Sequence, residues 1–147
     1  MGARVGVVGL GYEGLTIDEF CDEVRRLELK IVVDVRLNAL SRKAGFSKNG
    51  LRAALAEVGV DYLHLPSLGN PRDNRDGFAV PGSRAGDAAR DRYRSSLSGP
   101  DAHRAIETIA DYAQGVDVGL LCFEKNEREC HRELVLEQLE ALFLACG

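Results

Sequence analysis

The stretch Val116-Asp-Val-Gly-Leu-Leu-Cys122 is followed by Phe123-Glu124 and then by Cys130-His131-Arg132. Its apolar residues predict a strand over 116–122, and the apolar spacing after Cys130 predicts a helix over 130–145. Burial of a core does not require a thiol, a carboxylate, an imidazole and a guanidinium at such a junction. Open α/β sheets bind ligands at the carboxyl ends of their strands. The stretch therefore predicts a strand, a helix and a polar site between them.

Three further strands are expected, because short runs of β-branched and apolar residues occur earlier in the chain. They cover 4–9, 31–35 and 60–65. Helices are predicted to begin at Thr16 and after Ser47, and to cover 86–97 and 101–114. Strands that alternate with helices imply a mainly parallel sheet covered by helices. We therefore expect the α/β class and a single-domain three-layer sandwich over 1–147.

One segment, 67–85, is expected to form a long irregular loop. It is rich in Gly, Pro, Asn, Asp and Arg and shows no hydrophobic periodicity. Loops of this length in compact domains are usually functional or mobile. The strand before it, 60–65, alternates between apolar and polar residues, which predicts an edge or half-covered position, and Pro66 ends it.

The composition is that of a soluble globular protein. The chain has 147 residues, of which 45% are hydrophobic and 29% charged, enough for one domain with a full core. No apolar run is long enough to span a bilayer, and the N-terminus lacks the pattern of a signal peptide. The four cysteines have no disulfide-scaffold spacing. We expect a cytoplasmic protein with reduced thiols and no membrane partner.

Charge is unevenly distributed along the chain. Residues 36–104 carry 12 Lys and Arg against 7 Asp and Glu, although the whole chain has a net charge of −4. A basic middle is typical of proteins that meet an anionic ligand or a nucleic acid. A solvated arginine-rich loop explains the same counts.

Gly9-Leu-Gly-Tyr-Glu-Gly14 matches the dinucleotide fingerprint, and Asp34 lies 20 residues after Gly14. Two observations argue against NAD-type binding. The helix is expected to be capped at Thr16, after the last glycine, and the chain leaves little room for a catalytic domain. The pattern is better interpreted as a tight turn over Gly9–Gly14 in which glycine adopts positive φ.

Polar residues also follow the second and third predicted strands. Arg36, Ser41 and Arg42 follow the second strand close to Asp34, and a guanidinium recognises phosphate or carboxylate well. An ion pair between Asp34 and one of the arginines is an equal alternative. His64 lies near the end of the third strand, where it is a structural residue or part of a site.

The cysteines and their neighbours allow several chemistries. Cys130 at a helix N-terminus, next to His131 and Arg132, is a potential nucleophile. Cys122 and Arg128 have the Cys-x5-Arg spacing of phosphatase and sulfurtransferase loops, but the intervening residues lack glycine and include glutamates. Metal binding by both thiols and the imidazole is possible, but Cys-x7-Cys-His is not a familiar zinc spacing. We therefore assign no metal ligand, and the sequence leaves the cofactor unknown. Two further interpretations of these residues stay open. The thiols are buried within a structural polar network, or the polar residues form a non-covalent binding site.

Taken together, these residues resemble a bacterial and archaeal family called domain of unknown function 488, over about residues 5–140. The matching motifs are Gly11-Tyr-Glu-Gly14, Asp34-Val-Arg36, Ser41–Lys48, Tyr62–Gly69, Leu121-Cys-x-Glu124 and Cys130-His-Arg132. The resemblance implies a compact α/β sandwich in which the motif residues line a common site, and it implies no activity. Gly9 stands where many members have threonine, so the dinucleotide match looks accidental, and Ala44 replaces an expected proline.

The leading functional hypothesis is an enzyme that acts on a small anionic or nucleotide-like ligand at the strand carboxyl ends. The expected catalytic residues are Glu13, Glu124, Cys130 and His131. The expected ligand-binding residues are Tyr12, Asp34, Arg36, Ser41, Arg42, His64 and Arg132. One alternative is a module that binds nucleotide or nucleic acid through the basic segment 43–94 without catalysis. Another is a rhodanese-like sulfurtransferase that carries sulfur on Cys122.

Overall fold

The structure of the protein is a computed structural model in which residues 6–146 are described. These residues form a four-stranded, all-parallel sheet with the strand order β1-β4-β2-β3. The strands are β1 (Val7–Gly11), β2 (Ile31–Asp34), β3 (Asp61–His64) and β4 (Val118–Cys122). The α-helices are α1 (Ile17–Arg26), α2 (Lys48–Glu57), α3 (Arg84–Ser96), α4 (Pro100–Ala113) and α5 (Arg132–Cys146). The predicted α/β class with a parallel sheet is confirmed.

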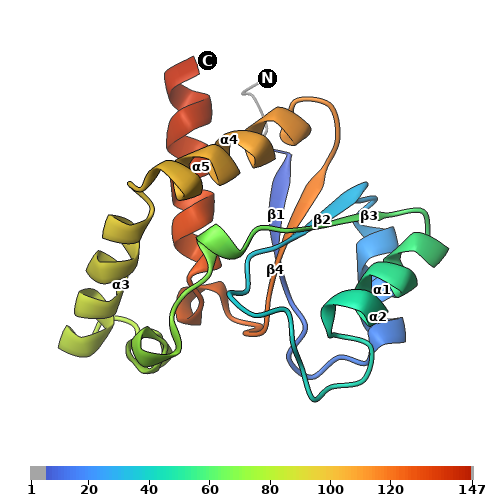
Figure 1. Cartoon of the computed structure of the whole chain (residues 1–147), viewed down its shortest axis with the longest axis horizontal. Helices are drawn as coiled ribbons and strands as arrows, with labels where there is room; N and C mark the ends of the chain where they lie inside the picture. The colour runs from blue at the N-terminus through green and yellow to red at the C-terminus, as the bar shows by residue number, and fades with distance from the viewer. Residues whose placement is uncertain (1–5, 147) are drawn as a thin grey trace.

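Helices cover both faces of the sheet, so the fold has three layers (Figure 1). On one face, α1 and α2 pack a core that includes Phe20, Val24, Leu51 and Leu55. On the other face, α3, α4 and α5 pack a second core. Cys21 is buried in the first core, as its position on the apolar stripe of α1 predicts. The central strands β2 and β4 are fully buried, whereas β3 lies at the edge and is half-buried.

The N-terminal strand corrects the interpretation of the glycine pattern. Strand β1 continues through Gly9 to Gly11, and the first residues of the expected strand, 4 and 5, lie outside the described part. The expected turn over Gly9–Gly14 is therefore wrong in its first half. A Cβ at Gly11 would overlap the carbonyl of Glu124, so glycine there allows a close approach of two chain segments. Within Gly9–Gly14, Gly14 is the one glycine with positive φ, at 81°.

Two helix starts show how the sequence directs local structure. The Thr16 hydroxyl accepts a hydrogen bond from the backbone N–H of Glu19, and the backbone N–H of Thr16 donates to the Glu19 carboxylate, which together form the predicted capping box. Ser47 is the N-cap of α2, but its hydroxyl hydrogen-bonds the backbone of Ser41 and so closes the 41–47 loop.

The segment 67–85 is less irregular than expected. It contains three short 3-10 helices that follow β3, at Pro66–Leu68, Arg72–Asn74 and Asp76–Ala79, and α3 begins at Arg84. Buried Phe78 and Leu68 anchor this segment against the second core, and the hydroxyl of Tyr93 on α3 donates to the Leu68 carbonyl. The segment is therefore a packed wall beside the sheet. No helix among the described residues is long and apolar enough to cross a membrane.

Candidate functional site

A pocket of about 360 Å³ lies at the carboxyl ends of β1, β2 and β4. Four parts of the chain line it: the ends of those three strands, the 38–40 loop, the 70–79 segment and the turn before α5. Its lining residues are Tyr12, Arg36, Asn38, Leu40, Asn70, Arg75, Asp76, Phe78, Ala79, Cys122, Phe123, Glu124, Glu129 and His131. This is the edge of the sheet at which the polar residues were expected to meet.

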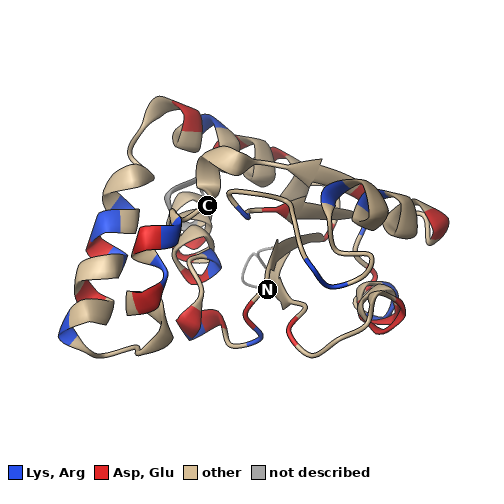
Figure 2. Cartoon of the chain, turned by 60° about the horizontal axis from the view of Figure 1, so that its bottom comes forward, with Lys and Arg blue, Asp and Glu red and all other residues tan. Residues whose placement is uncertain are grey.

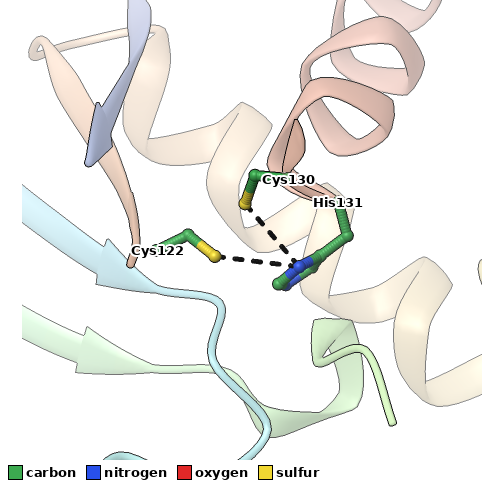
Figure 3. Close-up of side chains that lie close together, drawn as sticks. All are labelled: Cys122, Cys130 and His131. Carbon is green, nitrogen blue, oxygen red and sulfur yellow. Dashed lines mark hydrogen bonds between the residues drawn. The ribbon is translucent and has the colours of Figure 1, made fainter. Parts of the chain in front are cut away.

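Two thiols and an imidazole lie close together (Figure 3), and Cys122 and His131 of this group line the pocket. Cys122 is the last residue of β4, and Cys130 and His131 immediately precede α5. The Nδ1 atom of His131 lies 3.8 Å from the Sγ of Cys122 and 3.7 Å from the Sγ of Cys130. All three side chains are buried, and their ligand atoms lie within 4.8 Å of one another. We call Cys122, Cys130 and His131 the thiol–imidazole cluster.

The tautomer of His131 follows from its second ring nitrogen. Its Nε2 lies 2.7 Å from the carbonyl oxygen of Val35, which can only accept a hydrogen bond. Nε2 therefore carries a proton, and Nδ1 faces the sulfur atoms with its lone pair or, in the imidazolium, with a second proton.

The pKa values of the two thiols are shifted in opposite directions. A hydrogen bond from Cys130 holds the pKa of Cys122 well below its usual value, against the effect of burial, and the charge of His131 adds to this. Burial and the hydrogen bond to Cys122 raise the pKa of Cys130 well above its usual value. Burial would lower the pKa of His131, but the Cys122 thiolate and the Val35 carbonyl raise it. A thiolate therefore forms more readily on Cys122 than on Cys130.

Glu124 is a pocket residue with a raised pKa. Burial, and then the charge of Cys122, raises the pKa of Glu124 to about 7. Its Oε1 lies 3.6 Å from the Sγ of Cys122. A carboxyl group that titrates near neutral pH, beside a thiolate and in a pocket, can both donate and accept a proton under physiological conditions.

Arg36 occupies the pocket wall as one half of a buried ion pair. Its Nε and Nη2 donate to the two oxygens of Asp34, at 2.9 and 2.6 Å. Its Nη1 donates to the hydroxyl of Tyr12 at 3.2 Å and to the carbonyl of Phe46 at 2.7 Å. Tyr62 also donates to Asp34, at 2.5 Å. These bonds occupy four of the five guanidinium N–H groups, which leaves one for a ligand.

Arg132 shapes the loop after β4 and lies outside the pocket lining. Its guanidinium donates to the carbonyl of Glu124 and, at 3.0 Å, to that of Lys125. Its Nε is buried without a hydrogen-bond partner among the described residues. Arg132 was expected to bind an anion. Two of its guanidinium nitrogens instead donate to the backbone carbonyls of Glu124 and Lys125, and these contacts do not support the expected role.

The remaining predicted residues lie around the pocket. Glu13 is exposed and accepts a hydrogen bond from the backbone of Lys125 at 3.0 Å. His64 lies 2.8 Å from the carbonyl of Arg36 and so supports the loop after β2. Ser41 accepts from the Lys43 backbone, and Arg42 is exposed. Of the eleven predicted residues, Tyr12, Arg36, Glu124 and His131 line the pocket. Four more contact these lining residues through side chain or backbone: Asp34, His64, Cys130 and Arg132.

Sequence reasoning missed the wall opposite the strands, which Asn70, Arg75, Asp76 and Phe78 form. The expected long loop over 67–85 was the one signal for this wall of the pocket. No residue pattern within that segment indicated which of its side chains face the sheet.

The basic middle of the chain does not form a uniform positive surface. Figure 2 shows Lys and Arg interleaved with Asp and Glu, most clearly along α3. Three of the four arginines of this helix pair with acidic side chains: Arg90 with Glu133, Arg92 with Asp73, and Arg94 with Asp91 and Glu137. These pairs reduce the positive potential that a nucleic-acid backbone would meet.

The comparisons with known proteins identify a family. Neither the curated proteins nor the solved structures include a significant match to this chain. The family model described as "Domain of unknown function DUF488" matches residues 16–139. The matched part contains Asp34, Arg36, Glu124 and the whole thiol–imidazole cluster, and it covers nearly the entire chain. The protein therefore belongs to the DUF488 family, as the motifs in its sequence predict.

Proposed function

We propose that this protein is an enzyme that binds a small anionic or nucleotide-like ligand in the pocket and transfers a proton to or from it through Glu124. The observation that carries this proposal is the position of Glu124 in the pocket lining. Its pKa is raised to about 7, so both its protonated and its ionised forms are populated at neutral pH. General acid–base catalysis is most efficient when the pKa of the catalytic group is near the working pH.

The pocket favours a ligand that is small and partly anionic. Its volume, about 360 Å³, is near the lower end of small-molecule sites. Arg36 retains one N–H group, Arg75 also lines the pocket, and Asn38 and Asn70 add neutral hydrogen-bonding groups. The acidic Asp76 and Glu129 in the same wall favour a ligand that also carries hydrogen-bond donors, as sugar and nucleoside hydroxyls do.

The first experiment is a thermal-shift screen of the protein against nucleotides, sugar phosphates, simple anions and short DNA and RNA. A ligand at 100 times its dissociation constant stabilises by about 2.7 kcal/mol, which is a shift of several degrees. We expect a small-molecule hit that weakens in Arg75→Ala and persists in Arg104→Ala, an exposed arginine on α4. Turnover of that ligand, followed by chromatography, is expected to be lost in Glu124→Gln while binding persists.

Two results contradict the proposal. Binding with unchanged conversion in Glu124→Gln removes Glu124 from the reaction. A shift with nucleic acid alone that weakens steeply with salt favours a binding module without catalysis.

The lowered pKa of Cys122 favours one second candidate, a rhodanese-like sulfurtransferase. In that reaction the Cys122 thiolate attacks the outer sulfur of thiosulfate, a persulfide forms on Cys122, and sulfite leaves with the electron pair of the broken S–S bond. Mass spectrometry after thiosulfate treatment detects the persulfide. Unchanged sulfur transfer in Cys122→Ser rules the candidate out.

A further inference from the structure

We propose that the thiol–imidazole cluster binds a zinc ion, with Cys122, Cys130 and His131 as its three protein ligands and the fourth coordination position open to the pocket. The proposal deepens the proposed function, because a metal there would lie beside Glu124 and polarise a ligand in the pocket. The binding itself rests on the geometry of the cluster and does not depend on that activity.

The distances between the ligand atoms suit tetrahedral zinc. Zn–S bonds of about 2.3 Å and a Zn–N bond of about 2.0 Å at tetrahedral angles place sulfur and nitrogen about 3.6 Å apart. The Nδ1 of His131 lies 3.8 Å from the Sγ of Cys122 and 3.7 Å from that of Cys130. A single ion between the three atoms therefore requires only a small adjustment of the side chains.

The atoms around the cluster support the ligands as they do in metal sites. His131 donates its other ring N–H to the Val35 carbonyl, which directs Nδ1 toward the sulfur atoms. Metal-binding histidines almost always make such a bond. The backbone N–H of Arg132 donates to the Sγ of Cys130 at 3.4 Å, which stabilises a thiolate at that position.

The donor set selects the metal. Two thiolates and an imidazole favour zinc over calcium and magnesium, which prefer oxygen ligands. Three protein ligands with an open fourth position are typical of catalytic zinc sites. Cys122 and His131 line the pocket, which supplies an entry path, and Glu124 lines the same pocket, with its Oε1 3.6 Å from the Sγ of Cys122.

This site could not be assigned from the sequence, because Cys-x7-Cys-His lacks a familiar zinc spacing. The fold creates the site by placing the end of β4 next to the turn before α5. The carbonyl of Val35, the residue after β2, orients the ring of His131.

The test is a titration of the full-length, reduced and chelator-treated protein with Co²⁺, whose absorption spectrum reports thiolate ligands and tetrahedral geometry. We expect one Co²⁺ per chain, with thiolate-to-cobalt charge-transfer absorption that zinc abolishes by displacement. Cys130→Ser is expected to lose most of this absorption. Cys21→Ser is the matched control, since Cys21 is a buried free thiol in the core on the opposite face of the sheet, and it should bind as the unmodified protein does.

A second measurement on the unmodified protein covers the case in which Cys130→Ser does not fold. Saturating zinc is expected to slow alkylation of Cys122 and Cys130 and to leave Cys21 unchanged, as followed by peptide mass spectrometry. The proposal is overturned by a cobalt spectrum without thiolate absorption, by an unchanged spectrum in folded Cys130→Ser, or by zinc that protects neither thiol.

The variant Glu124→Gln separates this inference from the proposed function. Metal binding that persists in this variant, together with unchanged turnover, refutes the acid–base role of Glu124 and leaves the metal site standing. Turnover of a pocket ligand by protein that binds neither cobalt nor zinc refutes the metal site alone.

Discussion

The Nε2 atom of His131 lies 2.7 Å from the carbonyl oxygen of Val35 and thereby joins the start of α5 to the residue after β2. The two residues are 96 positions apart in the chain. This one bond sets the ring orientation of His131, and with it the direction in which Nδ1 faces the two sulfur atoms. It also satisfies a buried carbonyl at the edge of the pocket.

Replacement of His131 by glutamine is expected to destabilise the metal-free protein by about 1–3 kcal/mol, because the buried Val35 carbonyl loses its donor. Chemical denaturation in the presence of a chelator measures this. His103→Gln is the control, because His103 is exposed on α4 and its loss should change stability by about 0.5 kcal/mol or less. Equal stability of the two variants would show that the His131–Val35 bond contributes little.

The Asp34–Arg36 pair is expected to be essential for stability. Both side chains are buried, and removal of one partner leaves an uncompensated charge. Asp34→Asn should therefore cost about 3–5 kcal/mol in the free energy of unfolding. The surface pair of Asp101 and Arg104 gives the comparison, and Asp101→Asn should cost about 1 kcal/mol or less. A loss of under 1 kcal/mol in Asp34→Asn would mean that the pair relaxes or hydrates when broken.

Glu124 makes stability depend on pH in a defined direction. Its folded-state pKa, about 7, is above the ordinary value of 4.5, so the folded protein holds the proton more tightly than the unfolded chain does. This contribution is fully present below about pH 4.5 and is lost as the pH rises through 7. The expected loss is about 1–2 kcal/mol, reduced from the full conversion of the shift because Glu124 is partly exposed.

The measurement compares unfolding free energies of the unmodified protein and Glu124→Gln at pH 5 and pH 8. The difference between the two proteins should move in favour of Glu124→Gln as the pH rises. Parallel pH profiles would show that Glu124 titrates near its ordinary value and would remove the main support for its acid–base role.

The sequence predicted the elements well because their signals are local. The capping box at Thr16 and the β-branched run at 31–35 direct the backbone through neighbouring residues alone. The site was predicted less completely, because its contacts join distant segments. No local pattern reveals that Arg132 turns toward the Glu124 backbone, or that Phe78 places the 70–79 segment over the strand ends.

Gly11→Ala is expected to destabilise the protein and to displace the loop that carries Glu124. A Cβ at this position would overlap the Glu124 carbonyl, which is backbone and has little freedom to move. Overpacking of this kind costs about 1–3 kcal/mol. Gly115→Ala is the control, since a Cβ there meets nothing within 4 Å and no positive φ is needed. Equal thermal stability of the two variants would contradict the close approach of β1 to this loop.

Alkylation kinetics in chelator-treated protein distinguish Cys122 from Cys21, both of which are buried free thiols. The pKa of Cys122 is lowered by its bond with Cys130 and the charge of His131, whereas burial raises the pKa of Cys21. Cys122 also lines the pocket, so a small reagent such as iodoacetamide reaches it. Its alkylation rate is expected to rise less steeply with pH between pH 6 and pH 8 than that of Cys21, because a lowered pKa leaves more of Cys122 ionised at each pH, and the rate for Cys21 should rise about tenfold per pH unit. Peptide mass spectrometry of samples quenched over time gives both rates from one experiment. A tenfold rise per pH unit at Cys122 would mean that its thiol is protonated at neutral pH, and the sulfurtransferase candidate would lose its support.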